Sequence, residues 1–116
     1  MNPMRSIDAE TLQAKLSINE DILLVDVREP WEHKDFNIGG ILIPMNTIFE
    51  NLQQIPRDKP VLFYCQKGIR SALVIQRLEQ KFGFHNLLNL TGGMQSWKRN
   101  LESRSYGSDP DKTPGA

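Results

Sequence analysis

Residues 61–78 read VLFYCQKGIRSALVIQRL, and they contain the clearest structural pattern of the chain. The first four residues, 61–64, are the clearest strand pattern of the chain because all four side chains are apolar or aromatic. Residues 65–70 are polar and centred on a glycine, and the run from Ser71 to Leu78 repeats apolar side chains at helical spacing. The stretch predicts a strand, a tight loop that begins with Cys65, and a helix.

The same alternation extends along the rest of the chain. Short apolar runs bounded by turn residues predict three more strands, at 22–27, 41–43 and 87–90. An N-cap at Asp8, a proline at position 30 and glycines near the ends of periodic segments predict helices at 8–17, after Pro30, at 47–54 and after Gly93. Strands that alternate with helices are typical of an α/β protein, in which helices cover both faces of a parallel sheet.

Length and composition limit the function classes. A chain of 116 residues is expected to fold as one domain, which we place at 1–101. Residues 102–116 are mainly Ser, Gly, Pro, Asp and Lys, so we expect a disordered tail there. The 14 basic and 14 acidic side chains cancel, and this balance gives no reason to expect a nucleic acid or a membrane surface as partner.

Cysteine usage and hydropathy indicate the compartment. A single cysteine cannot form an intramolecular disulfide, which fits a reducing environment. The longest apolar runs are far shorter than the ~20 residues that a membrane-spanning helix needs, and no signal peptide is recognisable. We therefore expect a cytoplasmic protein. The cysteine and the two histidines have no metal-ligand spacing, so neither a metal nor a cofactor is predicted.

The position of Cys65 favours a nucleophile. It follows a buried strand and precedes a helix, and ligands of open α/β sheets bind outside the carboxyl ends of the strands. The helix dipole, Lys67 and Arg70 would favour the thiolate, and Gly68 would let the loop turn its amides toward one centre. The competing interpretation is a small core residue, which is the commoner role of a free cysteine. The polar residues that follow Cys65 favour chemistry instead.

Several motifs in this order resemble the rhodanese family of sulfurtransferases. They are Asp26-Val27-Arg28-Glu29 with Glu32, Ile38-x-Gly40 with Pro44, residues 65–72, and Gly92-Gly93 with Trp97. The resemblance runs from about Ser6 to Arg99 and implies a three-layer rhodanese-like fold, with a five-stranded parallel sheet and helices on both faces. One departure is Asn-Ile-Gly-Gly-Ile at 37–41, where relatives often have His-Ile-x-Gly-Ala.

The resemblance also implies a mechanism. Cys65 would take a sulfane sulfur from a small anionic donor such as thiosulfate and carry it as a persulfide to a thiol, cyanide or protein acceptor. The loop residues that would bind the thiolate and the substrate are Gln66, Lys67, Gly68, Ile69, Arg70 and Ser71. Around that loop we expect Asp26, Arg28 and Glu32, and either carboxylate is a candidate partner of Arg70.

Two functions from other classes are the alternatives. A cysteine phosphatase or arsenate reductase also holds an anion between a thiolate and an arginine, but such enzymes place five residues between the two, whereas four separate Cys65 from Arg70. The second alternative is a non-catalytic rhodanese-like binding module, although such modules commonly lack the cysteine. The two tryptophans, Trp31 and Trp97, are expected to be packing residues rather than substrate platforms.

Overall fold

The computed structural model describes residues 5–107. Within this part of the chain, five strands form one parallel sheet in the order β1-β5-β4-β2-β3. The strands are β1 (Ser6–Ile7), β2 (Leu23–Asp26), β3 (Ile41–Leu42), β4 (Val61–Tyr64) and β5 (Leu87–Leu90). The predicted α/β class is therefore confirmed. The residue patterns did not predict β1, because two residues are too few to show a strand period and β1 is defined by its pairing with β5.

Four α-helices lie in the described part of the chain and connect or follow the strands. They are α1 (Ala9–Ser17), α2 (Pro30–Asp35), α3 (Ile69–Phe82) and α4 (Gly93–Gly107). The predicted N-cap of α1 is confirmed, because the Asp8 carboxylate accepts a hydrogen bond from the Thr11 amide at 2.8 Å. Among residues 5–107, no helix combines the length and the apolar character that a membrane crossing requires.

The helix expected at 47–54 is wrong in type. The chain forms two short 3₁₀ helices there, η1 (Met45–Glu50) and η2 (Leu52–Gln54). Side chains of this segment bond its own backbone: Thr47 donates to the Pro44 carbonyl at 2.9 Å, and Asn51 donates to the Thr47 carbonyl at 2.8 Å. Such local bonds compete with the backbone bonds of a regular α-helix.

The C-terminal boundary also differs from the expectation. Helix α4 continues to Gly107, so residues 102–107 are helical although they were assigned to the tail. The glycine and prolines that suggested disorder begin only at Gly107, which explains the difference. The rest of the expected tail, 108–116, lies outside the described residues.

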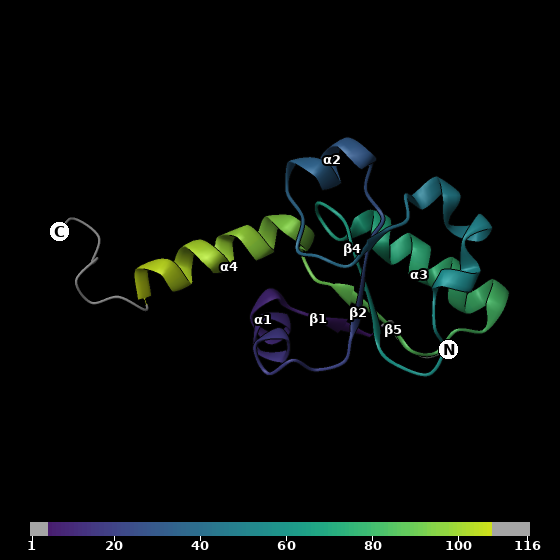
Figure 1. Ribbon diagram of the computed structural model, residues 1–116, viewed down its shortest axis with the longest axis horizontal. Coiled ribbons are helices and arrows are strands. Elements are labelled where there is room, and N and C mark those ends of the chain that lie inside the picture. The colour runs from purple at the N-terminus through teal and green to yellow at the C-terminus, as the bar shows by residue number, and fades with distance from the viewer. Residues whose placement is uncertain (1–4, 108–116) are drawn as a thin grey trace.

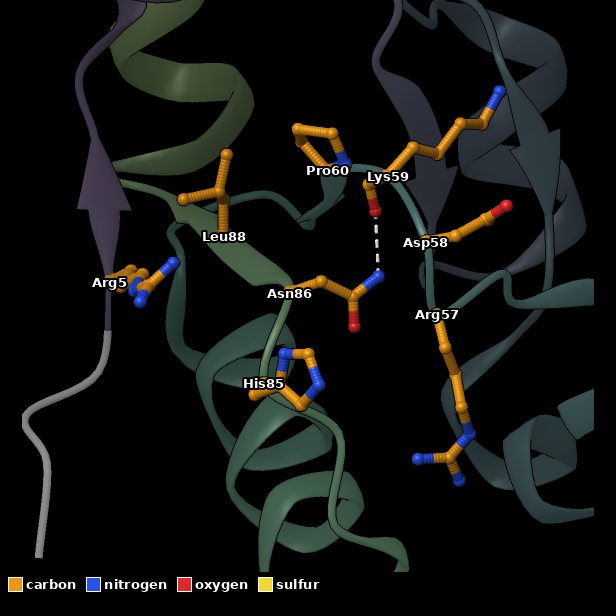
Figure 2. Close-up of a pocket in the computed structure, with 8 residues that line it drawn as sticks. All are labelled: Arg5, Arg57, Asp58, Lys59, Pro60, His85, Asn86 and Leu88. Atoms are coloured by element: carbon orange, nitrogen blue, oxygen red, sulfur yellow. Dashed lines mark hydrogen bonds between the residues drawn. The ribbon is translucent and has the colours of Figure 1, made fainter.

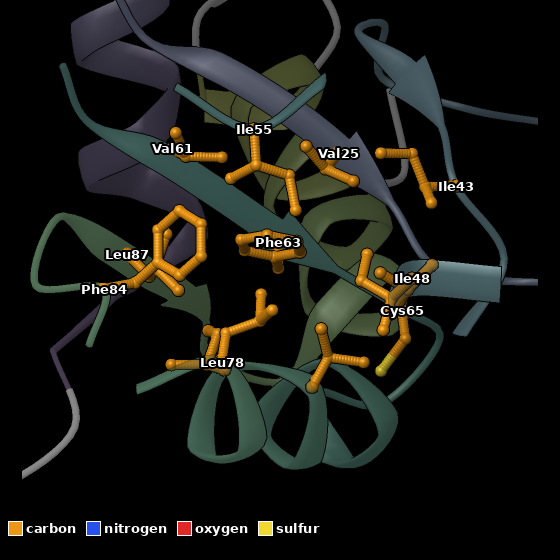
Figure 3. Close-up of a cluster of buried hydrophobic side chains, with 13 residues drawn as sticks. Val25, Ile43, Ile48, Ile55, Val61, Phe63, Cys65, Leu78, Phe84 and Leu87 are labelled. Atoms are coloured by element: carbon orange, nitrogen blue, oxygen red, sulfur yellow. The ribbon is translucent and has the colours of Figure 1, made fainter. Parts of the chain in front are cut away.

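The sheet separates two apolar clusters. Successive residues of β4 point to opposite faces, so Val61, Phe63 and Cys65 face α3 while Leu62 and Tyr64 face α1 and α4. Figure 3 shows the first cluster, with Cys65 at one end of it. Strand alternation alone therefore directs the cysteine toward the start of α3.

The two tryptophans differ in their surroundings. Trp97 of α4 is 6% exposed and packs in the cluster on the α1 side, as expected. The packing role expected of Trp31 is wrong, because its side chain is 72% exposed. Helix α2 has six residues and buries none of them, and it lies above the carboxyl ends of the strands rather than across a face of the sheet (Figure 1).

Candidate active site

The loop after β4 closes tightly on the cysteine sulfur. Gly68 adopts a left-handed conformation with φ 90° and is the N-cap of α3, so the helix begins at Ile69, two residues before the apolar run suggests. This turn points the Gly68 amide back at the Cys65 Sγ, at 3.1 Å. A residue with a side chain would be strained at that φ, which explains the glycine.

The Cys65 sulfur has polar partners that an ordinary core cysteine lacks. Its Sγ accepts hydrogen bonds from the amides of Gly68, at 3.1 Å, and Ser71, at 3.4 Å, and the Ser71 Oγ also lies at 3.4 Å. Cys65 is only 1% exposed, so its sulfur lies at the base of a pocket of about 350 Å³. Two inward amides at the start of a helix are an arrangement that favours negative charge on the atom they surround.

The first residues of α4 form hydrogen bonds to the backbone of the same loop. The amides of Met94 and Gln95 donate to the carbonyls of Cys65, at 2.9 Å, and Gln66, at 3.0 Å. A Cβ atom on Gly93 would lie 2.4 Å from the Cys65 carbonyl oxygen, so only glycine allows this close approach. The Gly92-Gly93 pair therefore allows α4 to pack closely against the cysteine loop, although α3 and β5 separate the two segments in the sequence.

Arg70 is paired rather than open to a ligand. Its two terminal nitrogens donate to the two carboxylate oxygens of Glu32, at 2.9 and 3.0 Å. The hydrogen bond from Arg70 lowers the pKa of Glu32, and the same bond raises the pKa of Arg70. Of the two carboxylates considered as partners, Glu32 is the one in contact. The bridge joins the cysteine loop to α2.

Asp26 and Arg28 form a separate buried ion pair. The Arg28 guanidinium donates to both Asp26 oxygens at 2.8–3.1 Å, and His33 Nδ1 lies 2.9 Å from one of them. Arg28 also donates to the Phe36 carbonyl at the end of α2. Burial lowers the pKa of Arg28, but the bonds to Asp26 outweigh this effect and raise it. Among residues 5–107, neither side chain forms a hydrogen bond to the cysteine loop. Both side chains contact α2 or its C-cap, through His33 and Phe36, and so help to position the helix that carries Glu32.

The remaining loop residues line the pocket. Its lining consists of Glu32, Cys65, Gln66, Lys67, Ile69 and Arg70. Lys67 takes part in no ion pair among residues 5–107, and Ile69 is 66% exposed at the rim. Within the same residues, no three His, Cys, Asp or Glu side chains are grouped as a metal site would require.

Asn89 is a residue of the site that the sequence analysis missed. It lies in β5 beside β4, is 8% exposed, and contacts the loop through both atoms of its amide group. Its Nδ2 donates to the Gly68 carbonyl at 3.2 Å, and its Oδ1 accepts from the Ser71 hydroxyl at 2.6 Å. A polar amide between leucines in a buried strand was the available signal.

A larger pocket, of about 710 Å³, lies at the other end of the sheet (Figure 2). Seven of its eight lining residues precede β1, β4 or β5, and Leu88 lies in β5, whereas Cys65 follows β4. Two of its cations have partners in the fold: Arg57 donates to the Phe82 carbonyl and Lys59 pairs with Asp21. Figure 2 also shows Asn86 bonded to the Lys59 carbonyl, an interaction that braces the loop before β4. This pocket does not include Cys65.

The fold and the loop define a class: an α/β domain with a buried cysteine whose sulfur accepts hydrogen bonds from two amides of the turn after a central strand. The model of the rhodanese-like domain family matches residues 8–100, and the chain belongs to this family. It is 39% identical over 97 residues to a sulfurtransferase of Allochromatium vinosum, covering 83% of this chain and 90% of that protein.

Two further similarities are consistent with this membership. The chain is 35% identical over 79 residues to the thiosulfate sulfurtransferase GlpE of Coxiella burnetii, covering 67% of this chain and 73% of GlpE. A crystal structure of a rhodanese-like domain protein from Staphylococcus aureus superposes with a TM-score of 0.74 at 35% identity, covering 81% of this chain and 91% of the other. The expected rhodanese-like fold is thereby confirmed.

Proposed function

We propose that the protein is a rhodanese-type sulfurtransferase in which Cys65 carries the transferred sulfur as a persulfide. The observation that supports this most is the pair of amides, from Gly68 and Ser71, that donate to the sulfur of the one cysteine in the chain. Relatives that match over nearly their whole length, such as the Allochromatium vinosum protein, are sulfurtransferases. A reduced cysteine is required for this role, which suits the cytoplasm.

The reaction has two displacement steps. The Cys65 thiolate attacks the outer sulfur of thiosulfate, the sulfur–sulfur bond of the donor breaks, and sulfite leaves with that bonding pair. The product is a persulfide whose negative charge lies on the outer sulfur. An acceptor nucleophile such as cyanide or a thiolate then attacks the outer sulfur, and the Cys65 thiolate is restored as the leaving group. No electron is gained or lost overall from the protein.

The charges at the pocket support an anionic donor. Glu32 and Arg70 neutralise each other, so Lys67 supplies the uncompensated positive charge of the pocket lining. Thiosulfate carries two negative charges, and a nearby ammonium would attract it and stabilise the sulfite that leaves. Thiosulfate is therefore the small donor that we propose, with a thiol, cyanide or a protein nucleophile as acceptor.

The site is less suited to phosphoryl or arsenate chemistry. Enzymes that bind tetrahedral oxyanions in such a loop use an arginine guanidinium to hold the oxygens, and here Arg70 is already engaged by Glu32. The loop is also one residue shorter than those enzymes require. A non-catalytic binding role would not need a polar cradle around the sulfur.

Steady-state kinetics test the proposal. Thiocyanate formation from thiosulfate and cyanide should give the parallel-line pattern of a ping-pong mechanism, and Cys65→Ser should abolish it while keeping a wild-type circular dichroism spectrum. A phosphate-ester substrate assayed in parallel should give no turnover. Thiocyanate formation by Cys65→Ser at the wild-type rate, or phosphatase turnover without sulfur transfer, would overturn the proposed function.

A further inference from the structure

The hydrogen bonds between Asn89 and Ser71 determine which atom faces the cysteine sulfur. A serine hydroxyl has one hydrogen, and the Ser71 Oγ lies 2.6 Å from Asn89 Oδ1 but 3.4 Å from Cys65 Sγ. An amide oxygen only accepts hydrogen bonds, so the hydroxyl hydrogen lies between Ser71 and Asn89. The serine therefore turns an oxygen lone pair, rather than its hydrogen, toward the sulfur.

The orientation of the Asn89 amide is fixed on its other side. The Gly68 carbonyl, which is also an acceptor, lies 3.2 Å from Nδ2, so the NH₂ group must face Gly68 and the oxygen must face Ser71. The main chain of Asn89 is held as well, because its amide donates to the Arg5 carbonyl at 3.0 Å. The side chain is 8% exposed, so water does not compete for these bonds.

We propose that Asn89 is a positioning residue that holds the Ser71 hydroxyl as an acceptor for the Cys65 S–H and so disfavours the free thiolate. The inference deepens the proposed function, since it concerns the protonation of the same nucleophile. When the thiol loses its proton, the hydroxyl must either keep a lone pair against the anion or turn its hydrogen to the sulfur and leave the buried Asn89 oxygen without a partner. In the persulfide the charge lies on the outer sulfur, and the serine keeps its bond to Asn89.

Other groups near the sulfur are separate from this device. Glu32, Lys67 and Arg70 line the same pocket and contribute charge, and the amides of Gly68 and Ser71 donate to the sulfur. These groups are present in every variant described next. A change that depends on both Asn89 and Ser71 is therefore attributable to the hydroxyl between them.

The pH dependence of alkylation tests the inference without any sulfur donor. Iodoacetamide reacts with the thiolate, and because the chain has one cysteine, the rate reports on Cys65 alone. Asn89→Leu, which keeps the branching at Cγ and removes the acceptor, should free the hydroxyl to donate to the thiolate and move the midpoint of the rate profile about one pH unit lower. The ultraviolet absorbance of the thiolate should move with it.

Two further variants keep the test decisive. In a Ser71→Ala background, Asn89→Leu should produce no further change, and Ser71→Ala alone should lower the midpoint, because it removes the oxygen that accepts from the S–H. An equal shift from Asn89→Leu with and without the hydroxyl would overturn the inference, because Asn89 would then act through Gly68. An unchanged midpoint in Ser71→Ala alone would also overturn it, since the hydroxyl would then have no effect on the thiolate, and so would a rise of about one pH unit, since the hydroxyl would then be a donor to the thiolate. The Ser71→Ala result decides the matter even where Asn89→Leu does not fold.

Discussion

Cys65 belongs both to the apolar core and to the polar loop, because it stands where β4 ends and the loop begins. Its side chain follows the alternation of β4 into the cluster with Phe63, while the chain turns at Gly68 and brings two amides to the sulfur. Burial excludes water from the sulfur, and the amides replace the hydrogen bonds that water would give. Because exposure is only 1%, a donor reaches the sulfur through the pocket and not across the surface.

At the same scale, Lys67 is predicted to select the charge of the donor. Lys67→Ala should lower kcat/KM for thiosulfate about tenfold, equivalent to ~1.4 kcal/mol, because a dianion loses one favourable charge. The value for an uncharged donor should change much less. Lys59→Ala is the matched control, since Lys59 lies at the opposite end of the sheet. Equal losses with both donors would show that Lys67 does not contact the donor through its charge.

The Glu32 carboxylate should make stability depend on pH. Its pKa lies below the usual 4.5 because of Arg70, so its contribution to the free energy of unfolding is present above pH 4.5 and is lost as the pH falls through the lowered pKa. Arg70 is about one-third exposed, and screening limits the effect to about 0.5–1 kcal/mol.

Urea unfolding of Glu32→Gln checks this sign. Glutamine keeps the bond that residue 32 accepts from the Glu29 amide, so the variant removes the charge and preserves the helix cap. The wild type should be the more stable protein at pH 6, and the two should converge in acid. The exposed Glu10→Gln serves as the reference. A difference that grows on acidification would contradict the assignment.

At the scale of elements, the site depends on how closely α4 approaches the cysteine loop. Gly93 and Gly83 both have positive φ, but a Cβ on Gly93 would overlap the Cys65 carbonyl, whereas nothing lies within 4 Å of one on Gly83. Gly83→Ala should therefore lose only ~1 kcal/mol of stability and keep its activity. Gly93→Ala should lose at least ~3 kcal/mol and most of its sulfur transfer. Similar losses from both, measured by urea unfolding, would mean that the contact between α4 and the loop is unimportant.

Elements were predictable from the sequence where their signal was local. The bounds of β4 and β5 follow from short buried apolar runs, and the ends of α1 and α3 follow from Asp8 and Gly83. The type of the 45–54 segment was not predictable, because side-chain bonds to its own backbone decide between helix types. Strand β1 exists only through its partner β5.

The site was partly predictable for the same reason. The cysteine loop is one continuous segment, so its glycine and its amide donors could be inferred. Which carboxylate meets Arg70 depends on the placement of α2, and that placement follows from the buried pair of Asp26 and Arg28. Asn89 contacts the loop only because β5 lies beside β4 in the sheet. The residues of the two strands do not predict that they are neighbours, so this contact could not be inferred from the sequence.

In the whole molecule, both faces of the sheet are covered by packed side chains, and the candidate site lies at the carboxyl ends of the strands. Helix α3 covers one face and α1 and α4 cover the other, and α2 lies over the carboxyl ends of the strands (Figure 1). Loops from β2, β4 and β5 meet at that edge, which supplies Glu32, the cysteine loop and the Gly-Gly turn. Chemistry at this edge is the rule for open parallel sheets, and here it places the one cysteine of the chain in the pocket.

A sulfur atom carried by Cys65 would be visible in the intact mass of the protein. The protein is incubated with thiosulfate, freed of excess donor and weighed with and without a reductant, beside Cys65→Ala. We predict a gain of one sulfur atom in the wild type, its removal by the reductant, and no gain in the variant. An unchanged wild-type mass under conditions in which thiocyanate is formed, or the same gain in Cys65→Ala, would contradict the account.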